Sequence, residues 1–221
     1  MNLNKKLKLE LNRVAVQRRT EEHELHQLFW ECTLRCNLSC RHCGSDCRML
    51  SEQNDMPLDD FLKVLDEIKL HEDPSKVMVI TTGGEPMMRR DLAFCGGEIS
   101  KRGFVWGMVT NGMLLTSEKL AEFVDNGLKS IAVSFDGFED DHNWMRGNSM
   151  SYKNVLKAVE AMKQHTALTW DVITCVNQRT IKYLPEFRDY LISLGIKRWR
   201  LFTVFPFGRA ANEPDLQLSN G

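Results

Sequence analysis

The sequence predicts an α/β protein whose core is an open, partial (β/α)6 barrel of six parallel strands. Two observations predict this fold. Short apolar runs alternate with amphipathic helical patterns from residue 26 to residue 211, and strict alternation of this kind produces parallel strands joined by right-handed crossovers. The six strand units are also fewer than the eight that close a barrel, so we expect one side of the barrel to stay open.

The strands are expected where the sequence shows short apolar or alternating runs. Val77–Ile80, for example, is a continuous apolar run of the kind found in strands that are buried on both faces. The last strand instead alternates, from Trp199 to Phe205. The six expected strands cover residues 28–30, 77–80, 105–109, 131–133, 172–176 and 199–205.

Helical spacing of apolar residues predicts a helix after each of the first five strands. Asp59 and Asp60 stand in the first turn of the first helix, where the helix dipole favours carboxylates. We expect Ser117 to cap the third helix and Gly127 to end it. The Gly96-Gly97 pair weakens the second helix. The five expected helices cover residues 58–68, 91–102, 117–126, 155–162 and 184–194.

Composition places the chain among soluble globular proteins. It has 221 residues, of which 43% are hydrophobic and 27% charged, as in one ordinary domain. The formal net charge of −1 argues against a broad nucleic-acid surface. Apolar runs all fall short of the ~18 residues that a membrane helix needs, and no signal-peptide core follows the N-terminal lysines. We therefore expect a cytoplasmic protein with no nucleic-acid and no membrane partner.

Charge and length suggest three parts. Residues 1–25 form a basic leader in which glutamates interrupt the lysines and arginines, as in a solvated segment. Residues 26–211 form the core domain, and residues 212–221 are a short tail.

Cysteines are concentrated in one loop. Of the seven cysteines, five lie between Cys32 and Cys47, and an odd, clustered set differs from a secreted disulfide framework. Cys36, Cys40 and Cys43 have a C-x3-C-x2-C spacing, just after the first expected strand. A 4Fe–4S cluster ordinarily takes four cysteines, so three suggest a cluster with one iron open to a small molecule. The alternative is a structural zinc site, whose fourth ligand could be Cys32, Cys47 or His42.

With His42 in the aromatic position before the third cysteine, this motif resembles that of the radical-SAM enzymes, and the resemblance covers residues ~25 to 211. It implies that Cys36, Cys40 and Cys43 ligate a 4Fe–4S cluster, that the open iron chelates S-adenosylmethionine, and that the fold is the partial barrel of that family. It further implies reductive cleavage to methionine and a 5′-deoxyadenosyl radical, which takes hydrogen from a peptide or small-molecule substrate. The electron would come from a flavodoxin- or ferredoxin-type donor.

Polar or glycine-containing loops follow all six expected strands, and in parallel α/β folds ligands bind at the carboxyl ends of the strands. A plain turn is the alternative at several of them, and a surface arginine is the alternative for Arg146. The resemblance assigns these loops to contacts with the cofactor. It implies that the Gly83-Gly84-Glu85 element binds the methionine amino group and that Arg146 pairs with the methionine carboxylate. It further implies that Ser134 and Asp136 contact the ribose or the amino-acid head group, that Val176 and Asn177 hold the adenine, and that Asn111 has a role because of its position after the third strand.

Two further segments, Cys40–Gly44 and Phe205–Ala210, resemble the branch of this family with a C-terminal SPASM extension. That extension normally carries cysteines for auxiliary clusters, but Cys175 is the last cysteine here. We therefore expect either a fragment, with the extension beginning in the tail, or a barrel that works alone. The predicted function is peptide modification or cofactor maturation. The alternatives are a non-catalytic zinc- or iron–sulfur-binding module and a simple electron carrier.

Overall fold

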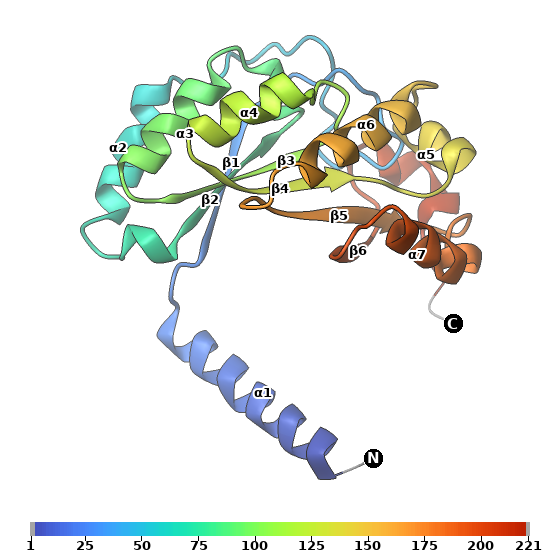
Figure 1. The fold of residues 1–221 in the computed structure, drawn as a ribbon, viewed down its shortest axis with the longest axis horizontal. Coiled ribbons are helices and arrows are strands. Elements are labelled where there is room, and N and C mark those ends of the chain that lie inside the picture. Colours follow the sequence, from blue (N-terminus) through green and yellow to red (C-terminus); the bar gives the residue numbers. More distant parts are fainter. Residues whose placement is uncertain (1–2, 220–221) are drawn as a thin grey trace.

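A computed structural model describes residues 3–219, and it contains one six-stranded sheet in the order β1-β2-β3-β4-β5-β6. Every neighbouring pair of strands is parallel. The strand at each end has only one neighbour, so the sheet stays open, as Figure 1 shows. The predicted α/β fold with a partial six-stranded barrel is confirmed.

The strands agree with the expected ones except at their ends. The second strand continues past the predicted Ile80 into the first glycine of the Gly83-Gly84 pair, and the last strand ends at Thr203, before Phe205. The strands are β1 Gln27–Thr33, β2 Met78–Gly83, β3 Val105–Thr110, β4 Leu128–Ser134, β5 Thr169–Val176 and β6 Trp199–Thr203.

All five predicted helices are present, and two more are found. The predicted ones are α2 Leu58–Ile68, α3 Leu92–Lys101, α4 Ser117–Asp125, α6 Ser151–Lys163 and α7 Leu184–Ser193; the additional ones are α1 Leu3–Glu22 and α5 Glu139–Arg146. Short 3-10 turns, η1 to η5, cover Pro74–Lys76, Pro86–Met88, Ile181–Tyr183, Gly208–Asn212 and Pro214–Leu216. None of the helices in the described part of the chain is long and apolar enough to cross a membrane.

Two details of the helices differ from the sequence-based expectation. The cap of α4 is Thr116, whose hydroxyl accepts a hydrogen bond from the Lys119 amide, and Ser117 is the first helical residue. In α3, the pair Gly96-Gly97 does not break the helix. A Cβ on Gly96 would lie 2.1 Å from the Trp106 ring, so this glycine lets α3 pack closely against β3.

Helix α1 extends away from the barrel (Figure 1). Its described side chains are all exposed, including Leu3, Leu7 and Leu11. Because α1 packs so little against the rest of the domain, its sequence needs no apolar stripe of the kind that predicts a helix. The sequence analysis therefore predicted only a solvated leader for this segment.

The core between the sheet and its covering helices fixes the strand ends. Its largest fully buried side chains include Trp106 on β3, Phe135 just after β4 and Phe187 on α7. The rings of Phe135 and Phe187 pack edge to face with centroids 5.3 Å apart. These residues pack the helices against the sheet. The packing fixes the positions of the strand ends from which the loops begin.

Candidate cofactor site at the carboxyl ends of the strands

The loop that follows β1 brings the three predicted cluster cysteines into one cavity of about 180 Å³. Cys36 and Cys40 are buried, and the partly buried Cys43 packs against them. The other walls come from the carboxyl ends of β2, β3 and β4. The full lining is Cys36, Cys40, His42, Cys43, Cys47, Thr82, Gly83, Gly84, Glu85, Val109, Thr110, Asn111, Ser134, Arg146 and Arg209.

The distances between ligating atoms bear on the two predicted kinds of metal site. In a tetrahedral zinc site, Zn–S bonds of about 2.3 Å bring the sulfurs within about 4 Å of one another. Within residues 3–219, the one group of three metal-ligating atoms that all lie within 4.8 Å of each other is His42, Asp136 and Cys175. The three loop cysteines form no such group. These thiols therefore offer no preformed set of ligands for a single zinc ion, and a cluster held by them stays the favoured prediction.

Two of the predicted ligand thiols, Cys36 and Cys40, are protonated before they bind a metal. Burial raises the pKa of Cys36 to about 11, and it also raises the pKa of Cys40 above its ordinary value of 9.0. Ligation therefore releases protons, as for other thiolate sites.

The two bracketing cysteines lie in different places. Cys32 is fully buried in the main core, where its Sγ donates to the Thr82 carbonyl, and it does not line the cavity. Cys47 is buried, packs against Cys36 and Cys40, and lines the cavity. Of the two, only Cys47 is a neighbour of the predicted ligands.

Gly83 and Gly84 face the cysteine loop through their backbone. A Cβ on Gly83 would lie 2.2 Å from the Thr33 carbonyl oxygen, and one on Gly84 would lie 2.2 Å from that of Arg35. The amide of Gly84 donates to the Thr33 oxygen at 2.8 Å and that of Glu85 to the Arg35 oxygen at 2.9 Å. Close approach to the neighbouring backbone, rather than to a ligand alone, requires glycine at these two positions.

The Glu85 carboxylate ties the end of β2 to the end of β3. It is 1% exposed. Thr110 Oγ1 donates to its Oε1 at 2.8 Å, the Asn111 amide donates to its Oε2 at 2.7 Å, and the Met87 amide also donates to Oε1. Burial raises the pKa of Glu85, and these hydrogen bonds oppose that rise. The Glu85 side chain therefore holds the carboxyl ends of β2 and β3 together beneath the cavity.

Removing the Glu85 carboxylate should destabilise the protein, and the loss should grow with the number of buried hydrogen-bond donors that are left without an acceptor. Glu85→Ala is expected to lower the free energy of unfolding by about 3 kcal/mol, because it leaves buried donors unsatisfied and a cavity behind. Glu85→Gln, which keeps the volume and one acceptor oxygen, should cost only about 1 kcal/mol. Urea denaturation of both variants tests this order, and equal losses would contradict the bridging role.

Asn111 contacts the cysteine loop directly. Its Nδ2 donates to Asn37 Oδ1 at 2.8 Å and lies 4.0 Å from Cys36 Sγ, while its Oδ1 accepts from the Met113 amide. Ser134, at the end of β4, lines the same cavity. Both side chains lie where the sequence analysis expected ligand contacts.

Asp136 and Arg146 form a buried ion pair beside Cys40. Arg146 Nη2 lies 2.6 Å from Asp136 Oδ2, and the two side chains are 7% and 0% exposed. Arg146 Nη1 donates to Cys40 Sγ at 3.7 Å, and Asp136 Oδ1 accepts from the Cys175 amide. Arg146 lines the cavity, whereas Asp136 stands behind it.

The compact group of His42, Asp136 and Cys175 includes the carboxylate of this ion pair, and this disfavours a metal ion there. Arg146 already supplies the positive charge that balances the Asp136 carboxylate, so a cation would be repelled at short range.

Val176 and Asn177 do not line the cavity. The Asn177 Oδ1 accepts from the Arg179 amide at 2.9 Å, and its Nδ2 donates to the Cys175 carbonyl. The side chain of Asn177 therefore folds back onto its own turn. An adenine role for these two residues stays a prediction.

Four lining residues were not predicted as ligand contacts: Thr82, Val109, Thr110 and Arg209. Three belong to predicted strands or their ends, so the barrel rule alone could have found them. Arg209 was placed in the last rim loop, but its contacts depend on how residues 204–217 pack.

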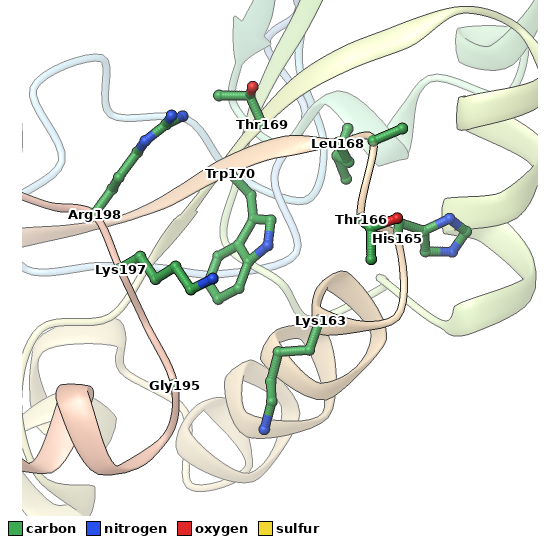
Figure 2. A pocket seen from close by; sticks show the side chains of 10 residues that line it. Lys163, His165, Thr166, Leu168, Thr169, Trp170, Gly195, Lys197 and Arg198 are labelled. Atoms are coloured by element: carbon green, nitrogen blue, oxygen red, sulfur yellow. The ribbon is translucent and has the colours of Figure 1, made fainter.

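A larger cavity, of about 490 Å³, lies at the opposite, amino-terminal rim of the sheet, and Figure 2 shows the side chains that line it. Lys163, Lys197 and Arg198 line it around Trp170. Lys163 ends α6 and already pairs with Glu160 at 2.9 Å. Cations at helix carboxyl ends commonly balance the helix dipole. No cysteine or carboxylate of the described chain lines this cavity, so it offers no set of cofactor ligands comparable to that around Cys36.

The fold and the site define a class: an α/β partial-barrel protein with a cysteine-lined cavity at the carboxyl ends of its strands. Residues 30–191 match the Radical SAM superfamily, and the chain belongs to this superfamily. The predictions of an enzyme, an iron–sulfur cluster and S-adenosylmethionine are thereby confirmed at the level of the family.

Known proteins of related sequence and structure agree with this assignment. An AdoMet-dependent heme synthase of Oleidesulfovibrio alaskensis is 26% identical over 183 residues, covering 82% of this chain and 46% of the relative. The tungsten-containing aldehyde ferredoxin oxidoreductase cofactor-modifying protein of Pyrococcus furiosus is 32% identical over 187 residues, covering 81% and 51%. The chain spans about half the length of these curated relatives.

The crystal structure of Streptococcus suis SuiB bound to S-adenosylmethionine has the same fold. It superimposes with a TM-score of 0.69 at 15% identity, covering 93% of this chain and 47% of SuiB.

Proposed function

We propose that this chain is the catalytic core of a radical-SAM enzyme in which Cys36, Cys40 and Cys43 ligate a 4Fe–4S cluster. The observation that carries the proposal is the shared cavity, where the three thiols meet the loop of Gly83, Gly84 and Glu85. When bound, the cluster and S-adenosylmethionine supply one-electron cleavage of the sulfonium and a radical that takes hydrogen from the substrate.

The chain's own residues bind and orient. Arg146 brings a guanidinium, suited to a planar carboxylate, to the cavity wall next to Cys40. The main chain of Gly83 and Gly84 forms the wall suited to an amino group, and Ser134 and Asn111 add a hydroxyl and an amide. Asp136 holds Arg146 in place, a positioning role that its burial favours over direct ribose contact.

Cofactor maturation or peptide modification is the proposed class of reaction. Both curated relatives are named for heme synthesis or cofactor modification. Residues 40–44 and 205–210 resemble the SPASM branch, and this resemblance supports a parent protein that has the SPASM extension. Because that branch includes peptide-modifying enzymes, the resemblance also supports a peptide as substrate.

We further propose a core domain over residues 26–211, a flavodoxin- or ferredoxin-type electron donor and the cytoplasm as compartment. The seven cysteines, which form no disulfide, fit a reducing environment.

Reconstitution of the iron–sulfur cluster distinguishes the proposed ligand cysteines from the other cysteines of the chain. After anaerobic reconstitution with iron and sulfide, the wild-type chain should be brown and should release 5′-deoxyadenosine from S-adenosylmethionine on reduction. Cys40→Ser should abolish this release, because the cluster loses a ligand. Cys95→Ser is the matched control, since Cys95 is buried in the core on α3 and should leave both readouts unchanged.

A colourless chain that binds one zinc ion tightly would overturn the proposal and support the structural-module alternative. A brown chain that never cleaves S-adenosylmethionine would instead support the electron carrier.

A further inference from the structure

We infer that Arg209 is a positioning residue that holds the cysteine loop in the shape needed for cluster binding. This inference rests on the proposed function. Arg209 follows β6 and is 169 residues distant in sequence from Cys40, yet it contacts the loop on which that cysteine lies.

One residue supplies hydrogen bonds to the main chain of three cysteines. The Arg209 amide donates to the Cys43 carbonyl at 2.9 Å, its Nε to the Cys40 carbonyl at 2.7 Å, and its Nη1 to the Cys47 carbonyl at 3.1 Å. These bonds end on carbonyl oxygens, so the sulfur atoms are not occupied by them. They fix the relative positions of two predicted ligands and of the neighbouring Cys47.

The loop conformation itself needs such support. Asp46, between Cys43 and Cys47, has a positive φ of 49°, which residues other than glycine adopt at some cost. Its Oδ1 accepts from Arg209 Nη1 at 2.7 Å. The same guanidinium therefore stabilises the strained residue and the carbonyl that follows it.

Arg209 is itself held by its neighbours. Gly208 has a φ of +57°, and a Cβ there would lie 2.3 Å from the Gly44 carbonyl oxygen and 2.5 Å from that of Cys43. Arg41 Nη1 donates to Glu213 Oε1 at 2.7 Å, which ties the next turn to the cysteine loop. Ala210 and Leu216 are buried in a small cluster with Met145 and Val204. Residues 204–217 thus form a strap that presses Arg209 onto the loop.

Three of the five N–H donors of this guanidinium, one on Nε and two on Nη1, point at the loop. Arg209 therefore acts through the shape of the loop, unlike Arg146, which contacts a thiol.

Cluster retention in the full chain tests the inference. Wild-type, Arg209→Gln, Arg209→Lys and Arg200→Gln chains would be reconstituted anaerobically, and the loss of visible absorbance would be followed in excess chelator. Arg200 is the matched control because it lies on β6, pairs with Asp171 and does not line the cofactor cavity. We expect Arg209→Gln to lose its cluster at least about tenfold faster than wild type, as for other residues that orient metal ligands.

Arg209→Lys keeps the charge but not the forked geometry, and it serves where Arg209→Gln does not fold by circular dichroism. We expect it to lose the cluster faster than wild type while unfolding at a similar temperature, and to show an altered electron paramagnetic resonance spectrum of the reduced cluster. A merely structural role would lower the unfolding temperature without changing that spectrum.

Arg209 variants that keep the cluster as long as wild type would overturn the inference and leave the proposed function intact. So would an Arg200→Gln chain that loses it equally fast. A wild-type chain that takes up no iron would instead overturn the proposed function, and with it this inference.

Discussion

Replacing Asp136 with alanine is expected to lower the free energy of unfolding by about 3–5 kcal/mol. The carboxylate is fully buried and lies 2.6 Å from Arg146 Nη2, so its removal leaves a buried cation without its partner. Arg146 also donates to Cys40 Sγ, and we expect its displacement to weaken binding of S-adenosylmethionine as well. Urea denaturation and equilibrium dialysis with the labelled cofactor measure the two effects.

A surface pair of the same residue types provides the control. Asp171 and Arg200 pair on neighbouring strands, but Arg200 is 49% exposed, so Asp171→Ala should cost under about 1 kcal/mol. Combining Asp136→Asn with Arg146→Met removes both charges and should recover stability relative to Asp136→Asn alone. If the effects of the two single changes simply add, the ion pair does not hold this part of the rim together.

The same pair gives the stability a defined dependence on pH. Burial would raise the pKa of Asp136, but Arg146 and the nearby histidines hold it below its ordinary value of 3.8. A carboxyl whose folded pKa is depressed contributes stability above its unfolded pKa, and this contribution is lost as the pH falls through the folded pKa. Wild type should therefore lose stability on acidification below about pH 3.8 more steeply than Asp136→Asn.

Gly84→Ala is expected to cost about 3 kcal/mol or more, because a single methyl group would meet fixed backbone. The new Cβ would lie 2.2 Å from the Arg35 carbonyl oxygen, 2.6 Å from its carbon and 3.1 Å from Cys36 Cβ. Relief requires the ends of β1 and β2 to move apart, which would break the hydrogen bond from Glu85 to Arg35. We expect the cluster to be lost as well, since the cysteine loop moves with Arg35.

Gly44→Ala is the matched control within the cysteine loop. Nothing lies within 4 Å of a Cβ at Gly44, so this substitution should change stability by less than about 0.5 kcal/mol. Thermal unfolding and the iron content after reconstitution compare the two variants. Equal behaviour would mean that the close approach at Gly84 does not determine the site.

Much of the fold follows from local patterns. The alternation that places Val77–Ile80 and Val105–Val109 in strands also places the ends of β2 and β3 side by side, because parallel strands share one rim. The cavity could therefore be predicted as far as Gly83, Gly84 and Asn111.

Contacts that depend on packing could not be predicted in this way. The sequence does not reveal that Asp136 turns toward Arg146, or that Asn177 folds back onto its own turn. Helix α5, which carries Arg146, spans only eight residues and is strongly polar, so it is too short for an apolar pattern to reveal it in the sequence. The need for glycine at 84 becomes visible only when the Arg35 carbonyl is placed opposite it.

The strap formed by residues 204–217 has a consequence for the order of assembly. Strands β1 to β6 pair in chain order, so each can add to the sheet as it leaves the ribosome. The carbonyls of Cys40, Cys43 and Cys47 gain these donors only after Arg209 has been made. We therefore expect the cysteine loop to reach the shape needed for cluster binding only after residues 204–217 have been made.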